Sequence, residues 1–498
     1  MADQNDRASY LTSRDPSIDR RFRPRPINQA VLFSDIAEED SSHFNLTQTV
    51  SSCSGSSNNS NKTIDTASVY LRLRPAKKCE IYSYCRNVFK TKHLDAHTVQ
   101  SQQHAKCAPE KHFEFTNVFN DTTKQYELYN SCVHSAIENE VNISTLTYGT
   151  SGSGKTYTLI GNQENPGIIP RAIQHLFTKY EDHILEFPCI KIDKGNIVIL
   201  DEHNMKNEII LKRKLLAACG SEDNDLQKQI IKNEHNFSSS SNEDVHIWIS
   251  FAEIYNELVY DLLADHGTGQ KENPSSVKRV PLKVISNDGN AFIKNLTTVH
   301  VKSSLESLKL LQLGRSRVCY AATNINDHSS RSHCIFFVDV IKAKNNELTH
   351  VSYKFCDLAG SERLKKTDNI GNRLREAQSI NNSLLVLGRC LDAVYHNQKK
   401  KTNDMVPIRD SKLTMLLQSS LLGKEKLTMV VNLWPRPDYF EENINVLNFA
   451  SIAQQIYYKP VPKRTSERFS WFISAAASSS PKSSNISNET ELLDENYK

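Results

Sequence analysis

The segment "YGTSGSGKT", Tyr148 to Thr156, has residue types and a spacing that could hold a phosphate group. In its Gly-x-x-x-x-Gly-Lys-Thr pattern, glycines let backbone N–H groups curl around a β-phosphate without side-chain clashes. The Lys155 ammonium would reach the β- and γ-phosphate oxygens, and the Thr156 hydroxyl would ligate Mg²⁺. A strand expected at 143–148 runs into Gly149, and a helix is expected to open at Lys155. This strand-loop-helix context predicts a nucleotide site.

Two later segments could sense a γ-phosphate. They are "NDHSSRSH", residues 326–333, and "DLAGSER", residues 357–363. The second directly follows the expected strand "VSYKFC", so Asp357 would hold an Mg²⁺-bound water and a glycine amide could contact the γ-phosphate. A phosphate loop alone is compatible with a GTPase, an ATPase or a kinase, and these two segments narrow the choice.

The surrounding pattern predicts the elements that position these residues. In "SVYLRLRP", Val69, Leu71 and Leu73 alternate with Tyr70 and Arg72, which indicates a strand that ends at Pro75. Further strands are expected at 143–148, 246–251, 335–341, 351–356 and 427–433. The clearest helix is expected at 376–394, where Ile380, Leu384, Leu387, Leu391 and Val394 share one face. Strands alternating with helices predict an α/β fold with a central mixed sheet flanked by helices on both faces.

Composition excludes several protein classes. The chain has 498 residues, 38% of them hydrophobic, and a net charge of +4, so any acidic partner must be met through local patches. Its 11 cysteines form no Cys-x-x-Cys pair and no metal-ligand spacing, which favours reduced thiols in the cytosol or nucleus. The polar N-terminus lacks a signal-peptide core, and no run approaches the roughly 20 apolar residues of a membrane span.

Three segments are expected to lie outside the regular core. Residues 1–65 are rich in Ser, Asn and Asp and predict a disordered arm. A polar stretch at 181–245 predicts a surface elaboration, partly helical at 206–218. Residues 459–498 contain Pro460, Pro462 and a Ser-rich tail, which is also expected to be largely disordered. The folded domain is therefore expected at 66–458.

These motifs together resemble the kinesin motor domain, a P-loop NTPase fold, over roughly residues 66–458. Further matching segments are "GIIPRAI" (167–173), "SFAEIYNELVYDLL" (250–263), "INNSLLVLGRCLDAV" (380–394), "VPIRDSKLTMLLQSSLLG" (406–423) and "NVLNFASIAQQI" (445–456). Within the family, the chain resembles the kinesin-6 class. Asn382 stands where most kinesins carry Lys, and the 181–245 insertion falls where that class expands a surface loop.

The resemblance implies an ATP site that includes Mg²⁺. The phosphate loop would consist of Gly149, Thr150, Ser151, Gly152, Ser153, Gly154, Lys155 and Thr156. Adenine would be framed by Arg72, Arg74 and Pro75, with Tyr157 stacking on its other face. The family commonly has Gln-Thr where this chain has Thr150-Ser151, but these positions contribute mainly backbone groups, so we expect hydrolysis to be retained.

The resemblance also implies roles in the two switch segments. Asn326 and Ser329 would contact the γ-phosphate and the attacking water, and Ser330 would join Thr156 on Mg²⁺. Gly360 would donate its amide to the γ-phosphate. Arg331 and Glu362 would form a salt bridge that closes the switches, and the proton of the attacking water would pass through a second water to Glu362.

The implied track is the acidic microtubule. Basic clusters that could contact it are Lys399, Lys400 and Lys401 in an expected loop, followed by Arg409 and Lys412. A second cluster lies between the 357–363 segment and the 376–394 helix: Lys365, Lys366, Arg373 and Arg375. Attraction of this kind should weaken with salt. Met415 stands where the family usually has Arg, and Asn382 where it usually has Lys, so we expect a weaker or slower motor.

The leading hypothesis is a microtubule-stimulated ATPase that moves toward plus ends on spindle or midzone microtubules, located on the cytoskeleton or, in interphase, in the nucleus. The alternative is a slow microtubule bundler aided by the basic segment "RRFRPRP" at 20–26. A nucleic-acid binder is disfavoured because the basic clusters lack aromatic interleaving. Residues 457–498 contain no apolar heptads, so this chain is expected to be monomeric, with any dimerising stalk lying beyond it.

Overall fold

The computed structural model describes residues 65–76, 81–85, 87–91, 110–219, 243–265, 279–287, 290–322, 331–344, 347–362 and 372–458. All of them lie in the compact unit Ser60–Lys498. The predicted arm up to residue 64 and the tail from residue 459 lie outside the described residues. Among the described helices, none combines the length and apolar character that a bilayer span requires.

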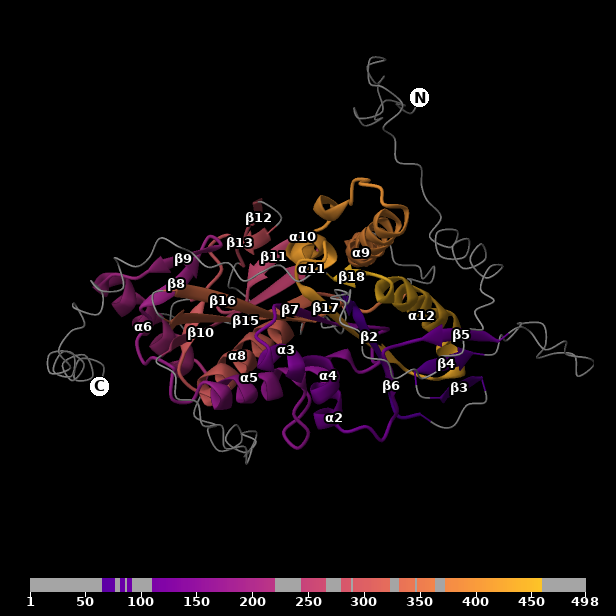
Figure 1. The fold of residues 1–498 in the computed structure, drawn as a ribbon, viewed down its shortest axis with the longest axis horizontal. Coiled ribbons are helices and arrows are strands. Elements are labelled where there is room, and N and C mark those ends of the chain that lie inside the picture. Colours follow the sequence, from indigo (N-terminus) through magenta and orange to yellow (C-terminus); the bar gives the residue numbers. More distant parts are fainter. Residues whose placement is uncertain are drawn as a thin grey trace, which may run out of the picture. The chain divides into compact units, whose positions relative to one another are not determined.

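A mixed sheet forms the centre of the domain (Figure 1). In spatial order its strands are β11 (Leu258–Asp261), β10 (Asp244–Tyr255), β15 (His333–Lys344), β16 (Glu347–Asp357), β7 (Ile143–Tyr148), β17 (Lys426–Leu433), β2 (Ser68–Leu73) and β6 (Asn117–Phe119), and β14 (Val299–Val301) also pairs with β10. The pairs from β11 to β16 are antiparallel, whereas those from β16 to β6 are parallel. The predicted mixed sheet is confirmed.

Helices cover both faces of this sheet because its strands carry apolar residues on both sides. On β17, for example, Val430 packs into one core, whereas Met429 and Val431 pack into the other. The first core is covered by α2 (Gln125–Tyr129), the π-helix η3 (Asn130–His134), α3 (Ser135–Glu138), α4 (Lys155–Leu159), α5 (Ile168–Lys179) and α8 (Ser304–Ala322). The second is covered by α9 (Asn372–Lys400), α10 (Lys412–Leu416), α11 (Gln418–Leu421) and α12 (Phe440–Gln454).

The 181–245 insertion has more structure than the sequence pattern predicts. Helix α6 (Glu202–Ala217) opens at Asp201, whose side chain accepts a 2.8 Å hydrogen bond from the Asn204 N–H. A hairpin of β8 (Ile190–Asp193) and β9 (Asn196–Ile199), which was not predicted, packs Ile190 against Trp248. Residues 220–242 lie outside the described residues.

Shorter elements complete the domain. A three-stranded sheet consists of β3 (Tyr82–Cys85), β4 (Val88–Thr91) and β5 (Lys111–Glu114). Two-stranded pairs join β12 (Val284–Asn287) to β13 (Asn290–Ile293), and β1 (Asp65–Thr66) to β18 (Tyr457–Tyr458). The 3₁₀ turns are η6 (Ile408–Asp410) and η7 (Pro437–Tyr439).

Helix α9 is longer than the predicted 376–394 helix. Its buried face holds Leu384, Leu387, Leu391 and Val394, as expected. The placement of Lys399 and Lys400 in a loop was wrong, because both belong to the last turn of α9. Only Lys401 lies in the following turn, with a φ of 54°.

Candidate functional site

The phosphate loop connects β7 to α4, as predicted. Gly149 adopts a φ of 147° and lies so close to the Asn432 carbonyl oxygen that a side chain would clash with it. Gly154 precedes α4 in the left-handed conformation, with a φ of 105°. Both positions therefore require glycine. The hydroxyls of Thr150 and Ser153 are buried and have no hydrogen-bond partner among the described residues, which suits a loop that surrounds a polar ligand.

Lys155 is buried under this loop. Its ammonium donates hydrogen bonds of 3.0 Å to both the Gly149 and Thr150 carbonyl oxygens. Burial lowers the pKa of Lys155, whereas the nearby carboxylates of Asp357 and Glu362 raise it. A buried cation with carboxylates on one side can bind phosphate oxygens strongly, because water does not screen it.

Thr156 and Asp357 meet at the ends of α4 and β16. The Thr156 hydroxyl donates a 2.5 Å hydrogen bond to Asp357 Oδ2, and the Thr147 hydroxyl donates a 3.1 Å bond to Oδ1. Burial raises the pKa of Asp357, and Lys155 acts against that rise. These neighbouring hydroxyl and carboxylate oxygens are ligands of the kind that Mg²⁺ prefers. The predicted third oxygen donor, Ser330, lies outside the described residues.

The segment after β16 touches the phosphate loop directly. Glu362 accepts a 2.8 Å hydrogen bond from the Ser151 N–H and a second bond from the Ser151 hydroxyl. The Ser361 N–H donates a 3.1 Å bond to the Gly149 carbonyl oxygen. A side chain at Gly360 would clash with both Glu362 and Ser151. This segment, the 357–363 switch segment and called switch II from here on, thus contacts the phosphate loop through backbone and carboxylate groups.

The other switch residues are only partly described. Arg331 is half-buried near the end of the first switch segment, and its salt bridge with Glu362 stays a prediction. Asn326 and Ser329 lie outside the described residues.

An aromatic platform lies beside the loop. The Arg74 guanidinium donates to the Gly152 carbonyl oxygen and lies 4.2 Å from the centre of the Trp434 ring. Arg72 instead reaches inward, donating 2.9 Å hydrogen bonds to Gln125 and Thr158, and lies 5.2 Å from the exposed Tyr157 ring. Pro75 is exposed beside Arg74. The sequence analysis did not identify Trp434, which follows β17 in a segment without a recognised motif.

His333 was also missed, although it is the last residue of the "NDHSSRSH" segment. Its Nδ1 accepts a 3.0 Å hydrogen bond from the Ala359 N–H, and its Nε2 lies 2.7 Å from the Ser383 hydroxyl on α9. Since a backbone N–H can only donate, the ring proton resides on Nε2 and points to Ser383. Burial, reinforced by Lys155, lowers the pKa of His333 to about 3, so the ring is neutral. It joins both switch segments to α9.

The basic residues proposed for track binding lie on α9 and the elements packed against it. Lys399, Lys400, Lys401 and Arg409 are exposed, whereas Lys412 is half-buried. Arg389 on α9 pairs with Asp410 at 3.2 Å, which places Arg409 beside the middle of that helix. Asn382 is exposed on α9, and Met415 lies 4.0 Å from the Lys412 ammonium through its sulfur. Lys365 and Lys366, and the side chains of Arg373 and Arg375, lie outside the description.

Comparison with protein families and curated proteins gives consistent relatives. The family model "Kinesin motor domain" matches residues 72–456. The kinesin-like protein subito of Drosophila melanogaster is 45% identical over 513 residues, covering 98% of this chain and 80% of that protein. The kinesin-like protein KIF20A of Bos taurus is 31% identical, covering 79% of this chain and 50% of that protein. Human KIF20B is 35% identical over 69% of this chain, but the match spans 20% of that protein.

Solved structures share the fold. A structure described as "kinesin 6" is 27% identical with a TM-score of 0.60, covering 77% of this chain and 98% of that one. A dimeric KIF14 motor, solved with AMP-PNP and a microtubule, is 24% identical with a TM-score of 0.59 and covers 80% of this chain and 96% of that one. At 24% identity, the similarity to the KIF14 motor supports the fold alone.

Proposed function

Because the chain belongs to the kinesin-6 family of microtubule-stimulated motor ATPases, we propose that it moves toward microtubule plus ends on spindle and midzone microtubules during cell division. The family resemblance supports both the direction and the place of action. The observation that carries the proposal is the contact of switch II with the phosphate loop on one side and, through His333, with α9 on the other.

In this proposal the phosphate loop binds ATP through its backbone amides and Lys155. Thr156, Ser330 and, through a water, Asp357 would hold Mg²⁺, which when bound neutralises charge on the β- and γ-phosphates. Asn326 and Ser329 would orient the attacking water. Glu362 would accept its proton through a second water and, paired with Arg331, would close the two switches.

The coupling to the track runs through a short chain of contacts. Glu362 senses the loop through Ser151, and three residues earlier Ala359 is bonded to His333. His333 is bonded in turn to Ser383, one turn before the buried Leu387 of α9. A shift of switch II on loss of the γ-phosphate would therefore act on α9, the helix that carries the basic residues.

ATP turnover with and without microtubules tests the motor function, and surface gliding separates it from the alternative. Steady gliding at saturating ATP is the expected result. Tight binding to microtubules without movement would instead favour a slow microtubule bundler. In that alternative the basic segment 20–26, which lies outside the described residues, adds a second contact with microtubules. Microtubule-independent turnover would contradict both.

The basic end of α9 gives a sharper test of the track face. Replacing Lys399–Lys401 with Ala should raise the microtubule concentration for half-maximal ATPase about five- to tenfold at low salt, since three exposed charge contacts are each worth up to about 0.5 kcal/mol. The basal rate should not change. A matched control removes three exposed lysines from other elements, namely Lys111, Lys194 and Lys206. If the control raised that concentration as much, only net charge would matter and the proposed face would be wrong.

A further inference from the structure

Three side chains remote from the catalytic groups converge between two helical segments. His134 closes η3, Glu138 closes α3, and His175 lies on α5. His175 Nε2 lies 2.6 Å from Glu138 Oε1, and His134 Nε2 lies 3.9 Å from the same oxygen. One ligand atom from each residue lies within 4.8 Å of the other two. No other such group occurs among the residues that the structure describes.

A π-turn places His134 beside Tyr129, the residue that contacts His175 in the cluster. In an α-helix, residues five apart would point about 140° away from one another. The wider turn of η3, with i to i+5 hydrogen bonds, instead brings Tyr129 and His134 together, with ring centroids 6.2 Å apart. Single π-turns of this kind often occur at functional sites.

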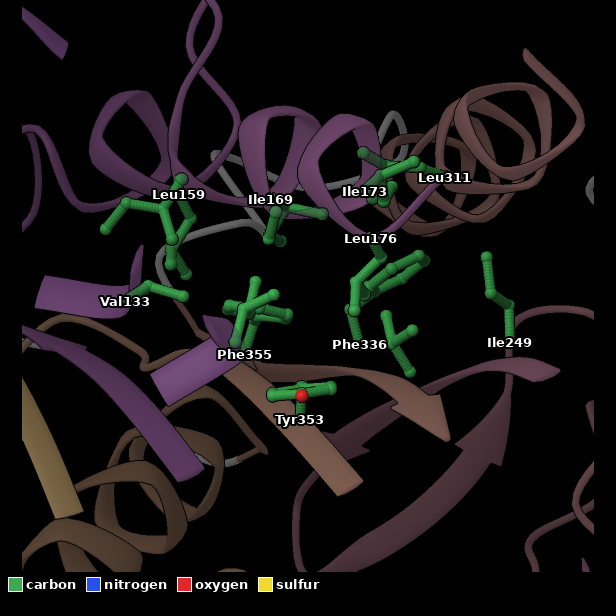
Figure 2. Packing of buried hydrophobic residues seen from close by; sticks show 14 of the residues in the cluster. Val133, Leu159, Ile169, Ile173, Leu176, Ile249, Leu311, Phe336, Tyr353 and Phe355 are labelled. Atoms are coloured by element: carbon green, nitrogen blue, oxygen red, sulfur yellow. The ribbon is translucent and has the colours of Figure 1, made fainter. Parts of the chain in front are cut away.

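Apolar neighbours fix the orientation of the two segments. Val133, Ile173 and Leu176 point into the core beneath the helices (Figure 2). His134 directly follows Val133, and His175 directly precedes Leu176. The two imidazole rings stack between η3 and α5 with their centroids 4.7 Å apart. His175 is buried, whereas His134 is exposed, so the cluster has one side open to solvent.

Neighbouring groups prepare the ligand atoms. His175 Nε2–H donates to Glu138 Oε1 at 2.6 Å, and the Tyr129 hydroxyl lies 2.6 Å from Nδ1. When a metal ion takes the place of the Nε2 proton, a proton on Nδ1 can be donated to Tyr129, which leaves the Nε2 lone pair for the ion. Lys179 donates to the Ile137 and Glu138 carbonyl oxygens at 2.8 and 2.7 Å, and lies 4.0 Å from Glu138 Oε2. Its charge is thus directed away from Oε1.

We propose that His134, Glu138 and His175 bind one divalent transition-metal ion of the zinc class, with water as the fourth ligand. Two imidazoles and one carboxylate suit Zn²⁺, whereas Mg²⁺ prefers oxygen ligands only. Tetrahedral coordination at about 2.0–2.1 Å separates ligand atoms by about 3.3 Å. The distance from His175 Nε2 to Glu138 Oε1, 2.6 Å, must therefore increase by about 0.7 Å, and that from His134 Nε2, 3.9 Å, must decrease by about 0.6 Å. Side-chain rotation allows both changes.

Such an ion would join the helical segment 125–138 to α5. The first residue of that segment, Gln125, donates a 2.8 Å hydrogen bond to the Tyr157 carbonyl oxygen at the nucleotide-binding helix. The proposed metal site would therefore stabilise a support of the nucleotide site without contributing a group to the reaction.

Calorimetric titration of the metal-free, reduced full chain with ZnCl₂ tests the proposal. Wild type should bind one ion, and Glu138→Gln and His134→Gln should each weaken binding at least about tenfold. Glu138→Gln keeps the shape of the side chain and its hydrogen bond with His175, and His134 is exposed, so both variants should fold. The matched control is His396→Gln, which removes a half-buried histidine paired with a carboxylate one turn away on α9, Asp392.

Cobalt provides a spectroscopic check of the ligand set. Bound Co²⁺ should show visible ligand-field bands, lost in Glu138→Gln, without a thiolate charge-transfer band. Zinc at about 100 times Kd should also raise the melting temperature of wild type by roughly 3–5 °C, and that of His134→Gln by much less. Equal zinc binding by wild type and both site variants, absence of binding, or a thiolate band would each overturn the proposal.

Discussion

His333 makes the folding stability of this motor depend on pH in a way that can be measured. The ring is buried between the two switch segments and α9, and it accepts from Ala359 while donating to Ser383. Protonation would place a second charge near Lys155 and turn Nδ1 into a donor facing the Ala359 N–H. We therefore expect acid to destabilise the junction of switches and α9, and substitution of His333 to remove part of that dependence.

The sign and size follow from the pKa. It falls from 6.5 in the unfolded chain to about 3 in the folded one, so the neutral ring stabilises the fold fully above pH 6.5, and this stabilisation is lost as the pH falls toward 3. Between about pH 7.5 and pH 5.5, only the interval from pH 6.5 to pH 5.5 lies below the pKa of the unfolded chain. Over that one pH unit the free energy of unfolding decreases by about 1.4 kcal/mol.

Urea unfolding of wild type and His333→Asn at these two pH values tests the estimate. Asn can still accept from the Ala359 N–H but does not titrate, so its stability should fall by about 1.4 kcal/mol less than that of wild type. Burial also lowers the pKa of His246 to about 4 and that of His300 to about 2, and both contribute equally to the two proteins. Replacing the exposed His112 should leave the wild-type loss unchanged. Equal losses in wild type and His333→Asn would refute the reasoning.

Three further predictions concern the nucleotide site. Lys155→Ala should lower ATP turnover at least about 100-fold in a steady-state assay, because the buried Lys155 ammonium lies directly under the loop that would hold the phosphates. Near-normal turnover would contradict its role. Glu362→Ala should retain nucleotide binding in a fluorescent-nucleotide titration but stop hydrolysis, and a wild-type rate would exclude the proposed switch closure. Trp434→Ala should weaken nucleotide binding about two- to fivefold through the loss of its contact with Arg74, whereas Trp434→Phe should not, and equal affinities would show that this platform is dispensable.

The sequence was sufficient for the long strands of the central sheet and for the phosphate loop because local patterns determine them, whereas the short strands β6, β11 and β14 were not predicted. Strand β7 is buried along its whole length and the loop requires glycines at defined positions, so both leave clear marks in the sequence. The resemblance to the kinesin-6 class is confirmed by the relatives that the chain matches. The β8–β9 hairpin escaped prediction because its strands are only four residues long, too short for a clear periodic pattern within a polar stretch.

Contacts between distant segments could not be predicted in the same way. His134 and Glu138 form an ordinary i,i+4 pair in the sequence, and only packing of α5 brings His175 beside them, 37 residues after Glu138. His333 is visible in its motif, but its contact with Ser383 spans 50 residues. Trp434 carries no motif and acquires a role only because Arg74 lies over it.

Helix α9 extends beyond the predicted helix 376–394 because the apolar periodicity that predicted it ends before the helix does. Its apolar face ends at Val394, and the next six residues, "YHNQKK", contain no further apolar period. Polar side chains sustain the helix instead, since His396 pairs with Asp392 at 3.3 Å and the Lys399 ammonium lies 2.9 Å from the Tyr395 hydroxyl. Lysines also suit the negative end of a helix dipole. Two of the lysines proposed to meet the track, Lys399 and Lys400, therefore have their backbone fixed by the same helix that contacts switch II through His333, so a movement of α9 would carry them with it.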